Sequence, residues 1–457
     1  MQKYANYEPS QADWLGFLPE HWDSRKVGAL FVERKTKVSD KDFAPLSVTK
    51  FGVVPQLANA AKTNAGDNRK LVRTGDFVIN SRSDRKGSCG VSGLDGSVSL
   101  INIVLTSRGI LDEKYIHYLL RSQPFSEEYY HNGRGIVADL WTTRYSEMKS
   151  ILLPVPPREE QDQIVRFLDW KVSSINKLTA IKKQQVSCYS ELRKAVIDQG
   201  ILHGFAGTKQ KDSGVYWLGE IPTSWEVLPL KRICKVNASI SDIVKTMSDD
   251  DMVTFLPMEN VTESGIVDCS IKKRVADVRS GFSSFAKGDV VVAKITPCFE
   301  NGKGACLDAL DTDIGFGTTE FINLRPGDRI CSKYLYMITM TRPFRKLGEE
   351  VMTGSAGQKR ISADYIKNFT LGIPSIEDQY AILNEIELRL KRIDKLCEIE
   401  SENIKHLQEL KARIISDTVT GKIDVRGIEI PKYEFMEESA DADAEDDIEE
   451  ETEEQEE

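Results

Sequence analysis

The stretch SQADWLGFLPEHW at residues 10–22 recurs as SGVYWLGEIPTSW at residues 213–225. Both copies keep Trp, Leu, Gly, Pro and Trp at the same spacing, with an offset of 203 residues. A chain that repeats such a segment is expected to contain two similar domains. The repeated tryptophans, which we expect to pack in the core at the start of each domain, are Trp14, Trp22, Trp217 and Trp225.

Four further segments repeat in the same order along the chain. They are TGDFVI at 74–79 and KGDVVV at 287–292, KGSCG at 86–90 and KGACL at 303–307, KYIHYLLRSQPF at 114–125 and KYLYMITMTRPF at 333–344, and LLPVPPREEQ at 152–161 and TLGIPSIEDQ at 370–379. The second pair aligns Cys89 with Cys306. Five matches in one order indicate a duplicated unit, with its insertions in the first part of each half.

A proline boundary and then a long helix follow each globular part. VPP at 155–157 and IPS at 373–375 precede acidic residues, which favour a first helical turn. A heptad pattern of apolar residues follows, and so narrow a stripe needs a partner helix. We expect the two helices, each about 60 Å long, to pack on each other and to end near Gly204 and Gly421. The predicted contact residues are Ile164, Leu168, Ile175, Leu178, Leu192 and Val196 in the first helix and Ile382, Ile386, Ile393, Leu396, Leu410 and Ile414 in the second.

These patterns predict an α+β fold with two similar domains in tandem, separated by two long helices. The expected boundaries are 1–157 for the first domain, 158–205 for the first helix, 206–375 for the second domain, 376–424 for the second helix, and 425–457 for an acidic, disordered tail. Residues 437–457 contain 14 Asp or Glu and no Lys or Arg, which leaves 57 acids against 61 bases in the rest of the chain. The net charge of −10 therefore does not exclude nucleic-acid binding by the folded part.

Several function classes lack their sequence signatures. No apolar run is long enough to cross a membrane, and the N-terminal segment lacks the order of a signal peptide. We therefore expect a cytoplasmic protein whose eight cysteines, without a CxxC pair, are reduced. There is no Walker A, HExxH or dinucleotide fingerprint, and no NPPY-type tetrapeptide. Asp139, Glu147 and Lys149 loosely imitate a nuclease D…ExK pattern that has no counterpart in the second half. We expect no catalytic residue, no metal site and no cofactor in this chain.

The repeated loops carry clustered polar groups that suit nucleic acid. Arg and Lys suit guanine or phosphate, and Asn and Gln suit adenine. A solvated basic loop is the alternative for any one cluster, but paired clusters at equivalent places favour DNA contact. The candidates are Arg82, Arg85, Lys86, Arg134 and Arg144 in the first half and Lys294, Thr296, Asn301, Lys303, Thr318, Thr319, Glu320, Gln358, Lys359 and Arg360 in the second.

The chain resembles the specificity subunit of type I restriction–modification systems over nearly its whole length to about residue 425. The motifs that carry the resemblance are WLGxxPxxW, the TGD or KGD strand, GSAGQKRIS at 354–362, the helix starts PPREEQ and PSIEDQ, and IISDTVTGKIDVRG at 414–427. The segment KGDVVVAKITPCFENGKGA at 287–305 is similar to one type of target-recognition domain. Two features depart from the family pattern: the acidic tail, and the weak match of HNGRGIVADLW at 131–141 to GSAGQKR.

The resemblance implies two target-recognition domains, each binding one half of a bipartite DNA site. It implies helices that pack as an antiparallel coiled coil, set the spacer and dock two methyltransferase subunits, with two restriction subunits recruited to the assembly. On this basis the chain catalyses nothing. The methyltransferase partner would bind S-adenosylmethionine and methylate a flipped adenine, and the restriction partner would bind ATP and Mg.

Two other hypotheses stay open at this stage. A coiled-coil adaptor would bind proteins and no DNA, and clustered bases in equivalent loops argue against it. A self-sufficient restriction or modification enzyme would need the methyl-donor and nuclease motifs that the sequence lacks.

Overall fold

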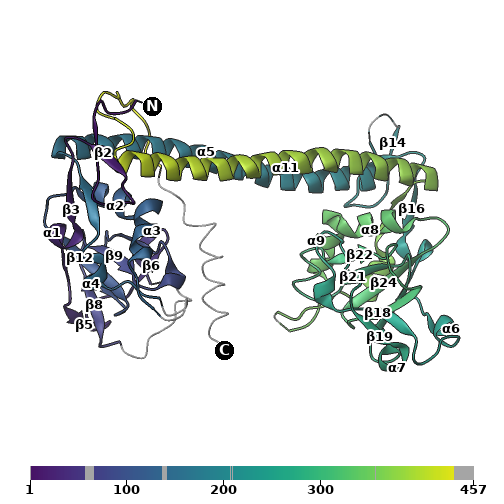
Figure 1. Ribbon diagram of the computed structural model, residues 1–457. Helices are drawn as coiled ribbons and strands as arrows, with labels where there is room; N and C mark the ends of the chain where they lie inside the picture. Colours follow the sequence, from purple (N-terminus) through teal and green to yellow (C-terminus); the bar gives the residue numbers. More distant parts are fainter. Residues whose placement is uncertain are drawn as a thin grey trace. The chain divides into compact units, whose positions relative to one another are not determined.

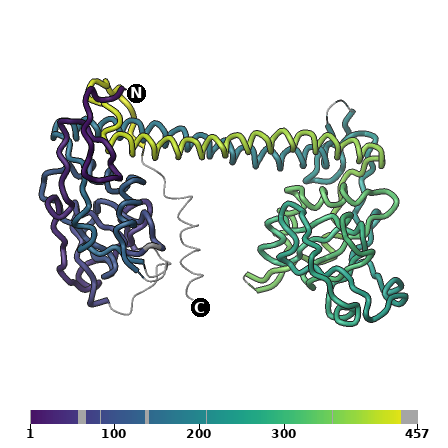
Figure 2. Tube along the Cα trace, in the orientation of Figure 1, coloured from purple at the N-terminus to yellow at the C-terminus, as the bar shows by residue number. Residues whose placement is uncertain are grey.

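The structure is a computed structural model that describes residues 2–56, 66–135, 141–205, 207, 209–355 and 357–436. Asp139 and the acidic segment 437–457 lie outside the described residues. The chain divides into two units, Met1–Lys183 with Ser401–Glu457, and Gln184–Glu400. Each unit therefore contains one globular domain together with parts of both long helices, as the chain trace shows (Figures 1 and 2).

The first domain is built on a four-stranded antiparallel sheet in the order β10-β9-β12-β4. Phe77 and Ile79 of β9 belong to the main core, whereas Val78 belongs to a smaller core on the opposite face. Burial of both faces explains why this strand is a continuous apolar run. The sheet strands are β4 (Phe31–Glu33), β9 (Phe77–Asn80), β10 (Cys89–Val91) and β12 (Asn102–Ser107).

Short strands and helices complete the first domain. A three-stranded sheet in the order β11-β8-β5 and the pairs β1-β2, β3-β13 and β6-β7 surround the central sheet. Their bounds are β1 (Tyr7–Pro9), β2 (Phe17–Pro19), β3 (Asp23–Lys26), β5 (Lys37–Val38), β6 (Leu46–Thr49), β7 (Gly52–Pro55), β8 (Arg69–Val72), β11 (Gly96–Val98) and β13 (Leu152–Val155). The helices before the long one are α1 (Val27–Leu30), η1 (Ser83–Arg85), α2 (Glu113–Leu120), α3 (Gln123–His131) and α4 (Tyr145–Met148).

The second domain repeats the central sheet in the order β22-β21-β24-β17. These strands are β17 (Cys234–Val236), β21 (Val290–Ala293), β22 (Gly304–Cys306) and β24 (Phe321–Pro326). The same strand order, with the same antiparallel pairing, confirms the duplication predicted from the sequence.

The second domain differs in its outer sheet, which has four strands in the order β19-β18-β23-β20 and pairs β18 with β23 in parallel. The outer strands and hairpins are β14 (Gln210–Asp212), β15 (Glu220–Pro222), β16 (Glu226–Pro229), β18 (Met252–Leu256), β19 (Lys272–Arg274), β20 (Ser283–Ala286), β23 (Ile314–Gly317) and β25 (Thr370–Ile373). The helices are η4 (Leu230–Arg232), α6 (Ser241–Val244), η5 (Met258–Asn260), α7 (Val275–Val278), α8 (Ser332–Met340), α9 (Arg342–Glu350) and α10 (Ala363–Asn368).

The strand register corrects one sequence match. Cys89 pairs with Ile79 on β9, whereas Cys306 pairs with Val290, which is the counterpart of Phe77. The residue of the first domain that is equivalent to Cys306 is therefore Val91. The match of KGSCG to KGACL predicted Cys89 instead. The loop before β22 is two residues longer than the loop before β10. The Lys-Gly pair of the second domain is therefore shifted by two positions from its strand, compared with the Lys-Gly pair of the first domain.

The two predicted long helices are present. α5 (Arg158–Asp198) continues into a π-helical turn, η3 (Gln199–His203), which ends at Gly204 with φ 68°. α11 (Ile376–Val419) is followed by Gly421 with φ 75°. Glycine adopts this left-handed conformation without steric cost, as a helix end requires.

Within each unit the two helices run antiparallel. In the first unit, Ile164 and Leu168 from the start of α5 share a core with Ile414 and Val419 from the end of α11. In the second unit, the core combines the α11 start with Ile201 after the end of α5. This arrangement confirms the predicted antiparallel pairing.

The helix stripe is less continuous than the heptad pattern predicted. Seven of the predicted residues are buried, and Val196 is half-buried. Four leucines keep 42–48% of their surface exposed, more than the heptad pattern predicted: Leu178, Leu192, Leu396 and Leu410. The buried members Ile164, Leu168, Ile175 and Ile414 belong to the core of the first domain, and Ile382 and Ile386 belong to the core of the second. The four leucines belong to neither core.

The chain after α11 corrects the predicted tail. Val425 is fully buried, and Gln163 on α5 donates to the backbone oxygens of Val425 (3.0 Å) and Ile428 (2.8 Å). Ser173 bonds the backbone of Glu434 and Met436. Residues 425–436 are therefore packed along α5, because polar side chains of α5 form hydrogen bonds with their backbone.

A buried glutamine fastens each domain to its own helix. Asp112 N donates to Gln161 Oε1 (2.7 Å), and Gln161 Nε2 donates to Pro156 O (2.9 Å). Gln379 repeats both bonds, with Cys331 N and Pro374 O. Both side chains are at most 1% exposed. The Gln in PPREEQ and PSIEDQ therefore joins a helix start to the loop that precedes α2 or α8.

The repeated tryptophan segment packs against the end of a long helix. A side chain at Gly421 would meet Pro19 and Trp22, and one at Gly204 would meet Trp225. Trp22 and Trp225 are buried, and Trp14 and Trp217 pack against the two cores. This confirms the expectation that the tryptophans are core residues.

Candidate nucleic-acid interface

Two loops of the first domain meet beside the end of β9. Thr143 N donates to Ser81 O (3.0 Å), and Arg134 and Thr142 exchange two backbone hydrogen bonds. The backbone of Arg82 also forms an isolated antiparallel β-bridge with Thr142. The structure thus brings together the predicted residues Arg82 and Arg134, which are 52 positions apart in the sequence.

Tyr130 connects Arg82 with a further predicted basic residue, Lys86. Its hydroxyl donates to Arg82 O (3.1 Å), and the Lys86 ammonium lies 5.6 Å from the centre of its ring. Arg82 and Lys86 are exposed. Arg85 lies 3.9 Å from the neighbouring Asp84, so part of its charge is offset locally.

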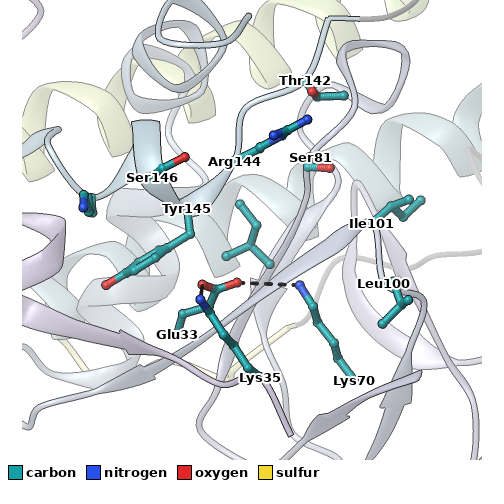
Figure 3. Close-up of a pocket in the computed structure, with 12 residues that line it drawn as sticks. Glu33, Lys35, Lys70, Ser81, Leu100, Ile101, Thr142, Arg144, Tyr145 and Ser146 are labelled. Atoms are coloured by element: carbon teal, nitrogen blue, oxygen red, sulfur yellow. Dashed lines mark ion pairs between the residues drawn. The ribbon is translucent and has the colours of Figure 1, made fainter. Parts of the chain in front are cut away.

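A pocket next to these loops extends the polar surface (Figure 3). The predicted residue Arg144 lines it, together with Ser81 and Thr142. Three lysines outside the predicted set also line it: Lys35, Lys70 and Lys149. The remaining lining residues are Glu33, Leu100, Ile101, Ile103, Tyr145 and Ser146.

The pocket contains four basic side chains and one acid. Glu33 pairs with Lys35 (3.2 Å) and Lys70 (3.7 Å), whose charged ends point toward it in Figure 3. Burial lowers the pKa of Lys70, and Glu33 opposes that shift. Because Arg144 and Lys149 are exposed, the pocket keeps a positive edge toward solvent. Such an edge suits phosphate groups.

The second domain joins the equivalent loops by the same backbone pattern. Ile361 N donates to Lys294 O (2.9 Å), and Thr353 and Arg360 exchange two backbone hydrogen bonds. Thr296 N donates to Lys359 O (3.0 Å). The predicted residues Lys294, Thr296, Lys359 and Arg360 are therefore close together.

Glu320 forms a two-point ion pair with Arg360. Arg360 Nε donates to Glu320 Oε2 (2.9 Å), and its Nη2 donates to Oε1 (3.0 Å). This pairing lowers the pKa of Glu320, with a smaller contribution from Lys294, while burial acts in the opposite direction. The parallel geometry is the one that guanidinium and carboxylate groups favour.

Two other predicted residues of the second domain, Thr318 and Gln358, contact this ion pair. Thr318 Oγ1 accepts from Glu320 N, and Gln358 O accepts from Arg360 Nη1. Lys303 O accepts from Ala293 N at the end of β21. No contact ties Asn301 or Thr319 side chains to the pair among the described residues, and both side chains are exposed.

Two of the pocket lysines outside the predicted set lie in recognisable sequence patterns. Lys35 lies in the basic run RKTK at 34–37, and Lys149 belongs to the nuclease-like D…ExK pattern. No sequence pattern indicates Lys70 or Glu33, because tertiary packing alone brings their strands together. Across the described ranges there is no group of three or more His, Cys, Asp or Glu placed to hold a metal ion. None of the helices in that same part of the chain is both long and apolar enough to span a membrane.

Comparison with known proteins gives consistent results. No family model matches the chain. It is 38% identical over 193 residues to the EcoAI specificity subunit of a type I restriction enzyme from Escherichia coli, a match that covers 41% of this chain and only 31% of that relative. It is 24% identical over 325 residues to the type I MjaVIII specificity subunit from Methanocaldococcus jannaschii, covering 70% of this chain and 72% of that one.

A solved chain from work on the assembly and conformational transition of a type I R-M system has a similar fold. The TM-score is 0.59 at 15% identity, and the match covers 89% of this chain and 99% of that chain. This likeness supports the architecture of paired domains and long helices. By its sequence, the chain is similar to specificity subunits of type I restriction enzymes, and it spans about a third of the length of the EcoAI relative.

Proposed function

We propose that the chain is the DNA-binding specificity subunit of a type I restriction–modification enzyme. Each globular domain reads one half of a bipartite target. The observation that carries this proposal is the pair of polar loops joined in the same way beside β9 and β21. An adaptor that binds only proteins has no need for basic groups on the equivalent loops of two domains.

The exposed basic side chains of the first domain are suited to contact the phosphate backbone of DNA. Lys35, Arg144 and Lys149 lie around one pocket, and Arg82 and Lys86 lie on the loop beside it. Phosphate contacts fix the register of a protein on the duplex, and base-edge contacts supply the sequence information. The first domain thus has groups for positioning, and we assign Ser81, Thr142 and Ile101, which line the same pocket, to contacts with base edges.

The helices have the role of spacer and docking surface in this proposal. Leu178, Leu192, Leu396 and Leu410 are exposed leucines on α5 and α11, and such residues suit contact with partner subunits. We propose two methyltransferase and two restriction subunits as the partners. The chain is then non-catalytic: S-adenosylmethionine belongs to the methyltransferase partner, and ATP and Mg belong to the restriction partner.

A selection experiment tests the proposal. The complex of this chain with its candidate methyltransferase partner is incubated with a pool of randomised DNA duplexes, and the bound fraction is sequenced. The expected result is enrichment of two short sequences separated by a fixed gap. The partner alone serves as control. Enrichment of no sequence by a stable complex would contradict the proposal and favour the adaptor hypothesis.

A further inference from the structure

Strand register identifies equivalent positions in the two domains without reference to their side chains. Asn102 pairs with Asn80 on β9, and Phe321 pairs with Ala293 on β21. The residues just outside these pairs are Ile101 and Ser81 in the first domain and Glu320 and Lys294 in the second.

The backbone bridges add a third pair of equivalent positions. Thr142 bridges both Arg82 and Arg134, and Arg360 bridges both Ile295 and Thr353. Thr142 and Arg360 are therefore equivalent. Three corresponding positions beside the central strands carry Ser81, Ile101 and Thr142 in one domain and Lys294, Glu320 and Arg360 in the other.

The side chains at these three positions are uncharged in the first domain and charged in the second. The first has two neutral hydroxyls and an apolar side chain, and all three line the same pocket. The second has two cations and an anion, joined by the Glu320–Arg360 ion pair. Two domains with one backbone pattern thus present different groups at the same three places.

The ion pair holds the Glu320 carboxylate in one orientation. Both of its oxygens accept from Arg360, and the backbone oxygen of Glu320 accepts from Lys294 N (2.8 Å). A carboxylate has about four lone-pair positions, so further acceptor capacity remains. The Glu320 side chain is 23% exposed, which leaves its outer edge accessible.

We propose that Glu320 determines specificity in the half-site read by the second domain. Its carboxylate accepts a hydrogen bond from an exocyclic amino group in the major groove, from cytosine N4 or adenine N6. Arg360 acts as a positioning residue that fixes the carboxylate. This inference rests on the proposed function, and it names the chemical group that the second domain reads.

The test uses the same duplex selection with the complex of full-length chain and methyltransferase partner. Three forms are compared: wild type, Glu320→Ala and Glu320→Gln. Glu320→Ala should lower the preference at one position of the second half-site by roughly 5- to 150-fold, the range for one good base contact. The first half-site and the gap should not change, and Glu320→Gln, which keeps one acceptor oxygen, should change the preference less.

The control variant is Glu263→Ala, which removes an exposed carboxylate of the same domain outside the cluster. It should leave both half-sites unchanged. An ion pair that only stabilises the loop would weaken all sequences equally, so equal loss at every position would overturn the proposal. An unchanged second half-site in Glu320→Ala would also overturn it. If the wild-type complex selects no split sequence, the proposed function fails first and this inference falls with it.

Discussion

The hydroxyl of Tyr115 donates a hydrogen bond to the backbone oxygen of Val419, 3.2 Å away and 304 residues later in the chain. Tyr334 repeats the contact with the backbone oxygen of Ile201 at 3.0 Å. Each domain is therefore fastened to the end of the helix that follows the other domain. With Gln161 and Gln379 at the helix starts, each unit holds both helices through buried polar groups.

Removal of one tyrosine hydroxyl should weaken this attachment. Burial raises the pKa of Tyr115 well above its usual value, so the hydroxyl remains a donor. Tyr115→Phe leaves the Val419 oxygen without this partner and should lower the free energy of unfolding by about 1–2 kcal/mol. Chemical denaturation measures the change. Tyr216→Phe, at a residue 90% exposed, should have no effect; equal stability of Tyr115→Phe and wild type would contradict the account.

Substitution of the buried glutamine should cost more. Gln161→Leu keeps the volume but leaves the Asp112 N–H and the Pro156 oxygen without these partners. We expect a loss of about 2–4 kcal/mol, because each buried group left unpaired costs about 1–3 kcal/mol. The exposed Glu159→Gln, in the same turn, should change stability far less. Similar denaturation midpoints for the two variants would argue against the role of Gln161.

Loss of two pocket lysines should reduce DNA affinity without altering the selected sequence. In Lys35→Ala/Lys149→Ala, each lost phosphate contact should lower the slope of log affinity against log salt by about 0.9. Fluorescence anisotropy on a duplex over a salt series measures this slope. The control Lys177→Ala/Lys245→Ala removes the same charge from α5 and from the segment after α6. Equal slopes in both variants would indicate only a general effect of charge.

The Glu320–Arg360 pair should give a pH-dependent contribution to stability. Because Arg360 holds the pKa of Glu320 below its usual 4.5, the contribution is present above pH 4.5 and is lost as the pH falls through the lowered pKa. The difference in melting temperature between wild type and Glu320→Gln should therefore be largest near neutral pH and disappear in acid. A difference that grows as the pH falls would contradict the assignment of this ion pair.

Equal lengthening of both helices should change only the gap in the DNA target. Seven residues inserted into α5 and seven into α11 preserve the heptad phase and add about 10 Å of helix. At 3.4 Å per base step, the gap should grow by about 3 base pairs. Duplex selection reads the gap and both half-sites in one experiment. An unaltered gap from a folded variant would refute the role of the helices as spacer.

The sequence predicted the domains and helices that repeated segments and apolar periodicity mark. The tryptophan segments, the KGD strand and the helix starts located both domains and both helices, because local sequence sets these elements. It did not predict the pairing of Glu320 with Arg360 or of Glu33 with Lys70, since those partners meet only through tertiary packing. The exposure of Leu178 shows the same limit: a heptad pattern indicates a stripe but not how far the partner helix covers it.

The most direct test of the central claim is methylation mapping by long-read sequencing. The chain is co-expressed with its candidate methyltransferase partner, and cells with the partner alone are the control. The account predicts N6-methyladenine at a split motif that occurs only when this chain is present. Absence of new methylation despite a stable complex, or the same motif without this chain, would contradict its role as the specificity determinant.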